Sequence, residues 1–193
     1  MGAPSHILNF PIDDVLFVFA LESEAGSLFK DFNVVFTGIG KVNAAYHLTK
    51  AIAKFNPKLI VNLGTAGSNA FKRYEVVTCT SFVQRDMDVR GLGFDLYKTP
   101  LSTEEVVLNY GLNYENLLVG VCGTGDSFDT TLDSKIYNVV DMEAYALALI
   151  AKSENIPFVC LKFISDGADD DAAESWTENV VHAGEAFYST LFN

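Results

Sequence analysis

The sequence predicts one α/β domain with a largely parallel sheet that helices cover. The chain has 193 residues, the size of one ordinary domain. Hydrophobic residues make up 49% of it and charged residues 20%, which is enough apolar material for a core. Short apolar segments alternate with amphipathic ones, as strands and helices do in α/β folds. We therefore treat residues 1–193 as a single domain.

The strand predictions rest on short apolar segments that are rich in branched and aromatic residues. Such segments are typical of strands that are buried on both faces of a sheet. Five of them are residues 15–20, 33–37, 58–63, 117–122 and 158–164. Residues 76–83 predict a further strand, whereas residues 87–114 show no pattern and predict a long excursion.

Helices are predicted where apolar residues recur every three or four positions. In residues 41–55 these apolar residues are Val42, Ala45, Leu48, Ala51 and Ile52. Residues 142–154 repeat the pattern, and Pro57 and Pro157 stand just beyond the two predicted helices, where a stop signal belongs. A last amphipathic helix is predicted over residues 175–191.

The charge and the cysteines exclude several partners. The formal net charge is -12, and a surface this negative repels phosphate backbones and anionic lipids. We therefore expect neither nucleic acid nor a membrane as a partner. The apolar run of residues 15–21 is too short to span a bilayer. Cys79, Cys122 and Cys160 are an odd number in apolar stretches and predict buried free thiols. We expect a cytoplasmic protein that binds a small molecule or another subunit.

Polar and glycine-rich segments follow the predicted strands, and ligands of such sheets bind beyond the carboxyl ends of the strands. These segments are residues 22–24, 37–41, 64–68, 123–128 and 165–169. Gly38 and Gly40 suggest a phosphate-binding loop. However, Asn43 stands where the dinucleotide motif needs its third glycine, and Val35 where a Walker loop needs its first. We therefore interpret both glycines as a tight strand-to-helix turn.

Three carboxylates are the candidate catalytic residues. Glu24 opens a helix after an apolar strand, Glu143 stands in the first turn of an apolar helix, and Asp166 ends a buried strand. Each alone is compatible with a helix cap. Together they fit hydrolysis of a glycosyl bond, in which one carboxyl is the acid and another activates water. The three histidines are far apart in the chain, so a histidine-based metal site or catalytic triad is not expected.

Five motifs together resemble those of the nucleoside phosphorylase/hydrolase superfamily. They occur in the order and approximate spacing of that superfamily at residues 37–45, 62–67, 125–128, 141–144 and 164–166. Within the superfamily the chain looks most like the 5′-methylthioadenosine/S-adenosylhomocysteine nucleosidases. The resemblance covers most of residues 15–191 and leaves residues 87–114 unmatched.

The resemblance implies a fold and an activity. The fold would be a three-layer sandwich whose central mixed, largely parallel sheet is covered by helices. The activity would be hydrolysis of the N-glycosidic bond of 5′-thio-substituted adenosines, releasing adenine, with no metal and no organic cofactor. Asp166 would be the general acid that protonates the purine, and Glu24 would activate the attacking water.

The same resemblance assigns the substrate-binding residues and a partner. Glu143 would bind the ribose hydroxyls, Met142 would pack under the sugar, and Phe128 would stack on the base. The other residues that it places at the purine nucleoside are Leu21, Ile39, Thr65, Ala66, Gly67, Ser127, Asp129, Ser165 and Trp176. It also implies a homodimer in which part of the unmatched stretch completes the pocket for the 5′ substituent.

Departures from the family's pattern leave alternatives open. Bacterial members have arginine at the position of Lys162, so it stays open whether Lys162 supports Glu143 as that arginine does. Trp176 stands where a phenylalanine usually covers the base. Asn62 stands where phosphorylases have an arginine, which favours water over phosphate as the acceptor. The alternatives are a purine nucleoside phosphorylase, a hydrolase of futalosine type, and a nucleoside-binding protein without turnover.

Overall fold

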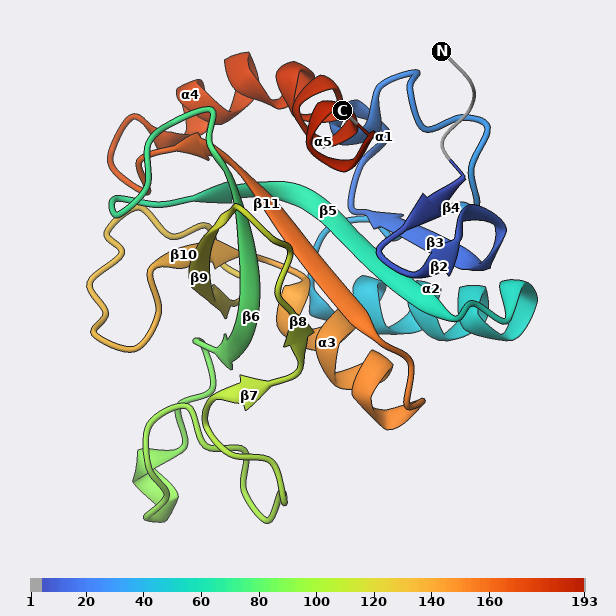
Figure 1. Ribbon diagram of the computed structural model, residues 1–193. Coiled ribbons are helices and arrows are strands. Elements are labelled where there is room, and N and C mark those ends of the chain that lie inside the picture. Colours follow the sequence, from blue (N-terminus) through green and yellow to red (C-terminus); the bar gives the residue numbers. More distant parts are fainter. Residues whose placement is uncertain (1–4, 193) are drawn as a thin grey trace.

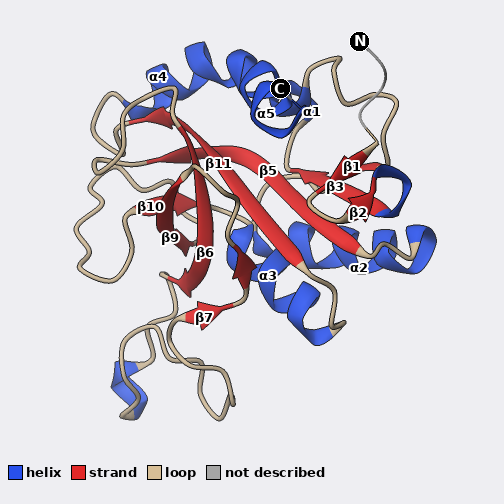
Figure 2. Cartoon of the chain, in the orientation of Figure 1, coloured by secondary structure: helices blue, strands red, loops and turns tan. Residues whose placement is uncertain are grey.

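The computed structural model describes residues 5–192, and it shows a mixed β-sheet with helices on both sides (Figures 1 and 2). The strands are β1 (His6–Ile7), β2 (Phe10–Pro11), β3 (Val15–Phe19), β4 (Val34–Phe36), β5 (Leu59–Gly67), β6 (Val76–Gln84), β7 (Leu108–Asn109), β8 (Gly111–Leu112), β9 (Leu118–Thr124), β10 (Val139–Asp141) and β11 (Phe158–Asp166). The helices are α1 (Glu22–Ala25), α2 (Lys41–Phe55), α3 (Ala144–Ser153), α4 (Ala172–Asn179) and α5 (Ala183–Phe192).

The large sheet has the strand order β4-β3-β5-β10-β9-β6-β11-β8, with β7 paired to β6. β3 runs parallel to β4 and β5, whereas β10 is antiparallel to β5 and β11 is antiparallel to β6. Because β11 also pairs with β5, the strands β5, β10, β9, β6 and β11 form a closed ring. Gly67 of β5 pairs with both Val140 and Asp166, so parts of three strands meet at one point.

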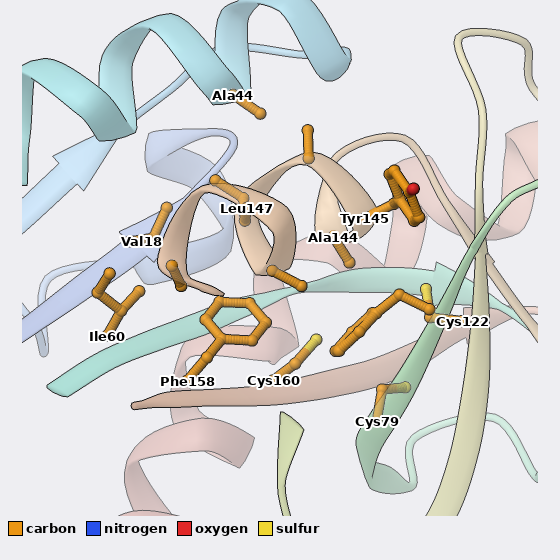
Figure 3. Packing of buried hydrophobic residues seen from close by; sticks show 14 of the residues in the cluster. Val18, Ala44, Ile60, Cys79, Cys122, Ala144, Tyr145, Leu147, Phe158 and Cys160 are labelled. Atoms are coloured by element: carbon orange, nitrogen blue, oxygen red, sulfur yellow. The ribbon is translucent and has the colours of Figure 1, made fainter. Parts of the chain in front are cut away.

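Helices cover both faces of this sheet, which confirms the predicted fold class. α2 and α3 lie on one side, and α1, α4 and α5 lie on the other (Figure 1). Under α3, Leu147 and strand residues such as Phe158 belong to one buried cluster (Figure 3). Under α1 and α5, the ring centroid of Phe19 lies 5.1 Å from that of Phe29 and 6.3 Å from that of Phe187. These two clusters hold the helices to the sheet.

Helix α2 occupies the residues that its periodicity predicts. Gly38 and Gly40 precede it with φ angles of 77° and 93°, a backbone that other residues rarely adopt. This confirms the tight strand-to-helix turn. The helix ends at Phe55, and its cap residue Asn56 has a left-handed backbone and stands directly before Pro57.

Three strands run further than the sequence predicts. β5 continues through residues 64–67, β9 through residues 123–124, and β11 to Asp166, where polar and glycine-rich sequence suggested loops. Polar residues remain in strand geometry here because the ladder pairing continues to the end of each strand. Glycine is needed at one of these positions, since a Cβ on Gly67 would lie 2.6 Å from Asp166 Oδ1.

The helices of the C-terminal third also differ from the prediction. α3 begins at Ala144, so Met142 and Glu143 precede the helix and Glu143 is its N-cap residue. The single helix predicted over residues 175–191 is two helices, α4 and α5, with a 3₁₀ turn between them at Val180–His182. The excursion predicted over residues 87–114 is mostly irregular, with β7 and β8 as its short strands.

Cys79, Cys122 and Cys160 are buried free thiols, as predicted, and all three lie in the cluster of Figure 3. Burial raises the pKa of the Cys122 thiol to about 11, so this side chain stays protonated at neutral pH. Within residues 5–192, every helix is too short or too polar to cross a membrane.

Candidate active site

A cavity of about 370 Å³ opens where the ends of β3, β5, β10 and β11 meet. Its size suits a small molecule. Most of the residues that the resemblance places at a substrate line it: Leu21, Glu24, Ile39, Thr65, Ala66, Gly67, Ser127, Phe128, Asp129, Met142, Glu143, Asp166 and Trp176. Ser165 does not line it, because this residue is fully buried behind Asp166. The lining also includes residues for which the sequence predicted no role in binding: Ala20, Arg85, Val140, Asp141, Ala173 and Thr177.

Glu24 lies in the short helix α1, directly after β3, and is buried. Its carboxylate accepts four hydrogen bonds. The backbone amides of Ala20 and Leu21 donate to Oε2 at 3.1 and 3.0 Å. The amide and the hydroxyl of Thr65 both donate to Oε1 at 2.8 Å. A carboxylate with so many fixed donors keeps one orientation at the cavity wall.

Asp166 is the last residue of β11 and is also buried. The Ser165 hydroxyl donates to its Oδ2 at 2.8 Å, and the Ala168 amide donates to its Oδ1 at 3.0 Å. Burial raises the pKa of Asp166 above its ordinary value, although both hydrogen bonds act in the opposite direction. A carboxyl with a raised pKa keeps its proton nearer to neutral pH and can act as an acid.

Glu143 is held at the cavity by the turn before α2. The backbone amide of Gly40 donates to Glu143 Oε1 at 2.8 Å. Burial raises the pKa of Glu143 to about 8, and the neighbouring Asp141 carboxylate adds to the rise. Lys162 forms its ion pair with Asp141, at 2.8 Å from Nζ to Oδ2, and its charge also opposes the rise in the pKa of Glu143.

The Asp141–Lys162 ion pair is buried on both sides, with side chains 0% and 1% exposed. Burial alone would raise the pKa of Asp141, but the ammonium of Lys162 holds it below its ordinary value. Asp141 also accepts the Thr124 hydroxyl at 2.5 Å and the amides of Glu143 and Ala144 at 3.2 and 2.8 Å. The pair therefore fixes the start of α3 and, with it, the backbone of Glu143.

Residues 125–129 follow β9 and form another part of the cavity wall. Phe128 on this loop is 51% exposed. Arg85 holds the loop: its guanidinium donates to the Ser127 hydroxyl at 3.2 Å and to the Ser127 carbonyl, and it lies 3.7 Å from Asp129 Oδ2. A Cβ on Gly125 would lie 2.9 Å from Arg85 Cζ, so glycine is required for this packing.

Arg85 is the clearest residue that sequence reasoning missed. Its side chain is 7% exposed, and its buried Nε has no hydrogen-bond partner within residues 5–192. It reaches the cavity because β6 pairs with β9, and its amide donates to the Thr124 carbonyl at 2.9 Å. No spacing in the sequence indicates this pairing.

The three histidines do not contribute to this site. His6, His47 and His182 are exposed and lie outside the cavity lining. In the part of the chain that the structure describes, His, Cys, Asp and Glu side chains form no cluster of three or more that could hold a metal ion.

The ring of strands and its carboxylate-lined cavity define an α/β protein with a small-molecule site at its strand ends. The family model described as the phosphorylase superfamily matches residues 24–191. The 5′-methylthioadenosine/S-adenosylhomocysteine nucleosidase of Staphylococcus haemolyticus is 32% identical over 177 residues, which cover 80% of this chain and 77% of that protein. The enzyme of the same name from Exiguobacterium sp. is 33% identical over 165 residues, covering 74% and 70%. The chain therefore belongs to the phosphorylase superfamily and, within it, to the family of these nucleosidases.

Solved structures share the fold. A Helicobacter pylori 5′-methylthioadenosine/S-adenosylhomocysteine nucleosidase in complex with a pyrrolidine compound superposes with a TM-score of 0.81 at 20% identity, covering 92% of this chain and 95% of that chain. The futalosine hydrolase of Helicobacter pylori also gives a TM-score of 0.81 at 20% identity, covering 92% and 94%. At such identities these two structures establish the fold but not the substrate.

Proposed function

We propose that the protein hydrolyses the N-glycosidic bond of 5′-thio-substituted adenosines, such as methylthioadenosine and adenosylhomocysteine, and releases adenine. One observation carries the proposal: a single cavity brings together Asp166, whose pKa is raised, Glu24, whose carboxylate is fixed by four donors, and Glu143. An acid and a water-activating carboxylate are the groups that hydrolysis of a glycosyl bond requires.

In the proposed reaction Asp166 gives its proton to a ring nitrogen of the purine. The C–N bond breaks, its electron pair moves to the purine, and adenine leaves as a neutral molecule. Glu24 takes one proton from water, whose oxygen bonds to the anomeric carbon. One water is consumed, and the products are adenine and a free sugar.

The other lining residues bind the nucleoside in this proposal. Glu143 binds the ribose hydroxyls, Met142 packs under the sugar, and Phe128 stacks on the base. Phe128 suits this role because half of its surface is exposed and available to a ligand. Glu143 suits its role because Gly40 holds only one of its two oxygens.

Water fits the site better than phosphate as the acceptor. A phosphate dianion needs cationic donors in a buried site. Arg85 is the only Lys or Arg that lines the cavity in the described part of the chain, and its Nη atoms already serve the loop of residues 125–129. Asn62 is buried between strands, where its side chain donates to the Val18 carbonyl at 3.1 Å. The site therefore presents no cluster of cations for phosphate.

We also propose that the protein acts as a cytoplasmic homodimer. Ile39, Val42 and Tyr46 are 48%, 79% and 57% exposed, and they lie on the turn before α2 and on its first half. A second copy that covered this apolar surface would border the cavity, because Ile39 also lines it. The buried free thiols fit a reducing compartment. A protein that sediments as a monomer and has full activity would contradict the dimer.

A substrate screen tests the function. Adenine or hypoxanthine release is measured for methylthioadenosine, adenosylhomocysteine, adenosine, inosine and futalosine, each with and without phosphate. We expect the two 5′-thio nucleosides to react fastest at a rate that phosphate does not change. A preference for futalosine would support a futalosine-type hydrolase, and a requirement for phosphate would support a phosphorylase. Binding without turnover would support a nucleoside-binding protein.

A further inference from the structure

The only tryptophan of the chain takes part in a hydrogen-bond chain that ends at Glu24. The indole Nε1 of Trp176 donates to the Thr65 hydroxyl at 3.0 Å, and this hydroxyl lies 2.8 Å from Glu24 Oε1. An indole N–H can only donate. The Thr65 oxygen therefore accepts from Trp176, and its single proton points to Glu24.

The four hydrogen bonds at Glu24 equal the number of lone pairs on an ionised carboxylate, so water can give a proton to Oε1 only when one of these donors turns away. Three of the four donors are backbone amides, of Ala20, Leu21 and Thr65, which the fold holds in place. The Thr65 hydroxyl is the one donor of the four that can rotate. When Glu24 takes a proton on Oε1, this oxygen becomes a donor, and a neighbouring donor must give way.

We propose that Thr65 is a positioning residue whose hydroxyl follows the protonation of Glu24, and that Trp176 holds this hydroxyl in place. Before the reaction the hydroxyl donates to the carboxylate. As a proton passes from water to Glu24 Oε1, the hydroxyl turns its own proton toward the cavity, and its second lone pair accepts the new O–H of Glu24. No bond of Thr65 is broken. The inference rests on the proposed role of Glu24 in activating water.

Helix α4 gives the indole a fixed position for this role. At the end of α4, the Asn179 amide donates to the Ser165 carbonyl at 2.8 Å and accepts from the Tyr74 hydroxyl at 2.9 Å. These bonds attach the helix to β11 beside Asp166. A phenylalanine in place of Trp176 would cover the cavity equally well but would leave the Thr65 oxygen without this donor.

Substitutions at Thr65 test the hydroxyl directly. Thr65→Val keeps the shape of the side chain and removes the hydroxyl, and Thr65→Ser is the matched control that keeps it. For methylthioadenosine we expect kcat of T65V to fall about tenfold or more, the scale of a hydrogen bond to a charged group, with KM within about threefold. T65S should keep kcat within about threefold of the unmutated protein.

Trp176→Phe tests the second link of the chain. We expect W176F to lower kcat about three- to tenfold in the unmutated background and less than about twofold in the T65V background, because the interaction it supports is already gone there. The fluorescence of Trp176 provides a second readout in T65V and T65S, since it reports the binding of a nucleoside independently of the rate of turnover. Binding should be unchanged in both.

Two results would overturn the inference: an unchanged kcat in T65V, or an equal loss from W176F in both backgrounds. If T65V fails to fold, the other two variants decide, because W176F must lower kcat and T65S must not. An unmutated protein that releases no base from any nucleoside would instead refute the proposed function. The two failures are therefore distinguishable.

Discussion

The carboxylate region of the cavity, formed by Glu24, Asp141 and Asp166 with Lys162 as the buried ion-pair partner of Asp141, is built differently from the loop of residues 125–129. Glu24, Asp141 and Asp166 are buried and hydrogen-bonded at the end of a strand or shortly after one, and Lys162, in the middle of β11, is buried and ion-paired with Asp141. On the loop, Phe128 is half exposed, and one arginine holds its neighbours. The sheet thus fixes the groups that we assign to bond cleavage, whereas the groups that we assign to base binding are attached to its edge. Substitutions in the two regions should therefore fail in different ways.

The largest effect is expected at the proposed acid. Asp166→Asn keeps the shape of the side chain and removes the proton, so kcat for methylthioadenosine should fall about a hundredfold or more, the usual scale of a general acid. Binding, read from Trp176 fluorescence, should change little. Steady-state adenine release measures the loss, and near-normal turnover by D166N would remove Asp166 from the mechanism.

An effect of comparable size, on the free energy of unfolding, is expected at the buried ion pair. Lys162→Met leaves the Asp141 carboxylate buried without its counter-charge, which should cost about 3–5 kcal/mol of unfolding free energy. Urea unfolding measures this cost. The double variant D141N/K162M is the control and should recover much of the loss, because neither charge remains. A K162M protein as stable as the unmutated one would show that the pair does not hold the carboxylate region together.

Glu143 should make stability depend on pH. Its pKa is raised from 4.5 to about 8 in the folded protein, so between these values the folded state binds more protons than the unfolded state. Stability therefore falls as pH rises through this window. In Glu143→Gln this contribution is absent, and the Tm of E143Q relative to the unmutated protein should rise from pH 5 to pH 8. A Tm difference that is independent of pH would contradict the raised pKa.

The smallest effect on the fold is expected in the loop. Phe128→Ala should raise KM about tenfold, the scale of stacking between an aromatic side chain and a base. Because Phe128 is 51% exposed, the unfolding midpoint in urea should hardly change. F128Y keeps the ring and should bind normally. A large loss of stability in F128A with an unchanged KM would reverse the contrast between the two regions.

The sequence predicted the periodic parts of the fold and missed what depends on pairing between distant segments. α2 has its predicted bounds, because its apolar stripe and the flanking Gly40 and Pro57 are local signals. The last helix was predicted as one, since a 3₁₀ turn at Val180–His182 leaves the apolar spacing almost intact. For the ends of β5 and β9 the sequence predicts loops, because apolarity is the strand signal and these ends are polar.

The candidate active site shows the same division between local signals and pairing of distant segments. Glu24 and Asp166 could be proposed from sequence because each directly follows, or ends, a recognisable apolar strand. Arg85 could not, because only the pairing of β6 with β9 brings it to the cavity. The partner of Lys162 could not be assigned either, since the choice of Asp141 over Glu143 depends on α3 starting at Ala144.

The most direct test of the central claim is the identity of the sugar product when phosphate competes with water. Methylthioadenosine is converted to completion by the unmutated protein in excess inorganic phosphate, and ³¹P NMR and mass spectrometry follow the products. The carboxylate-lined cavity predicts adenine and free methylthioribose, with inorganic phosphate as the only phosphorus signal. A stoichiometric sugar 1-phosphate would contradict hydrolysis and establish a phosphorylase.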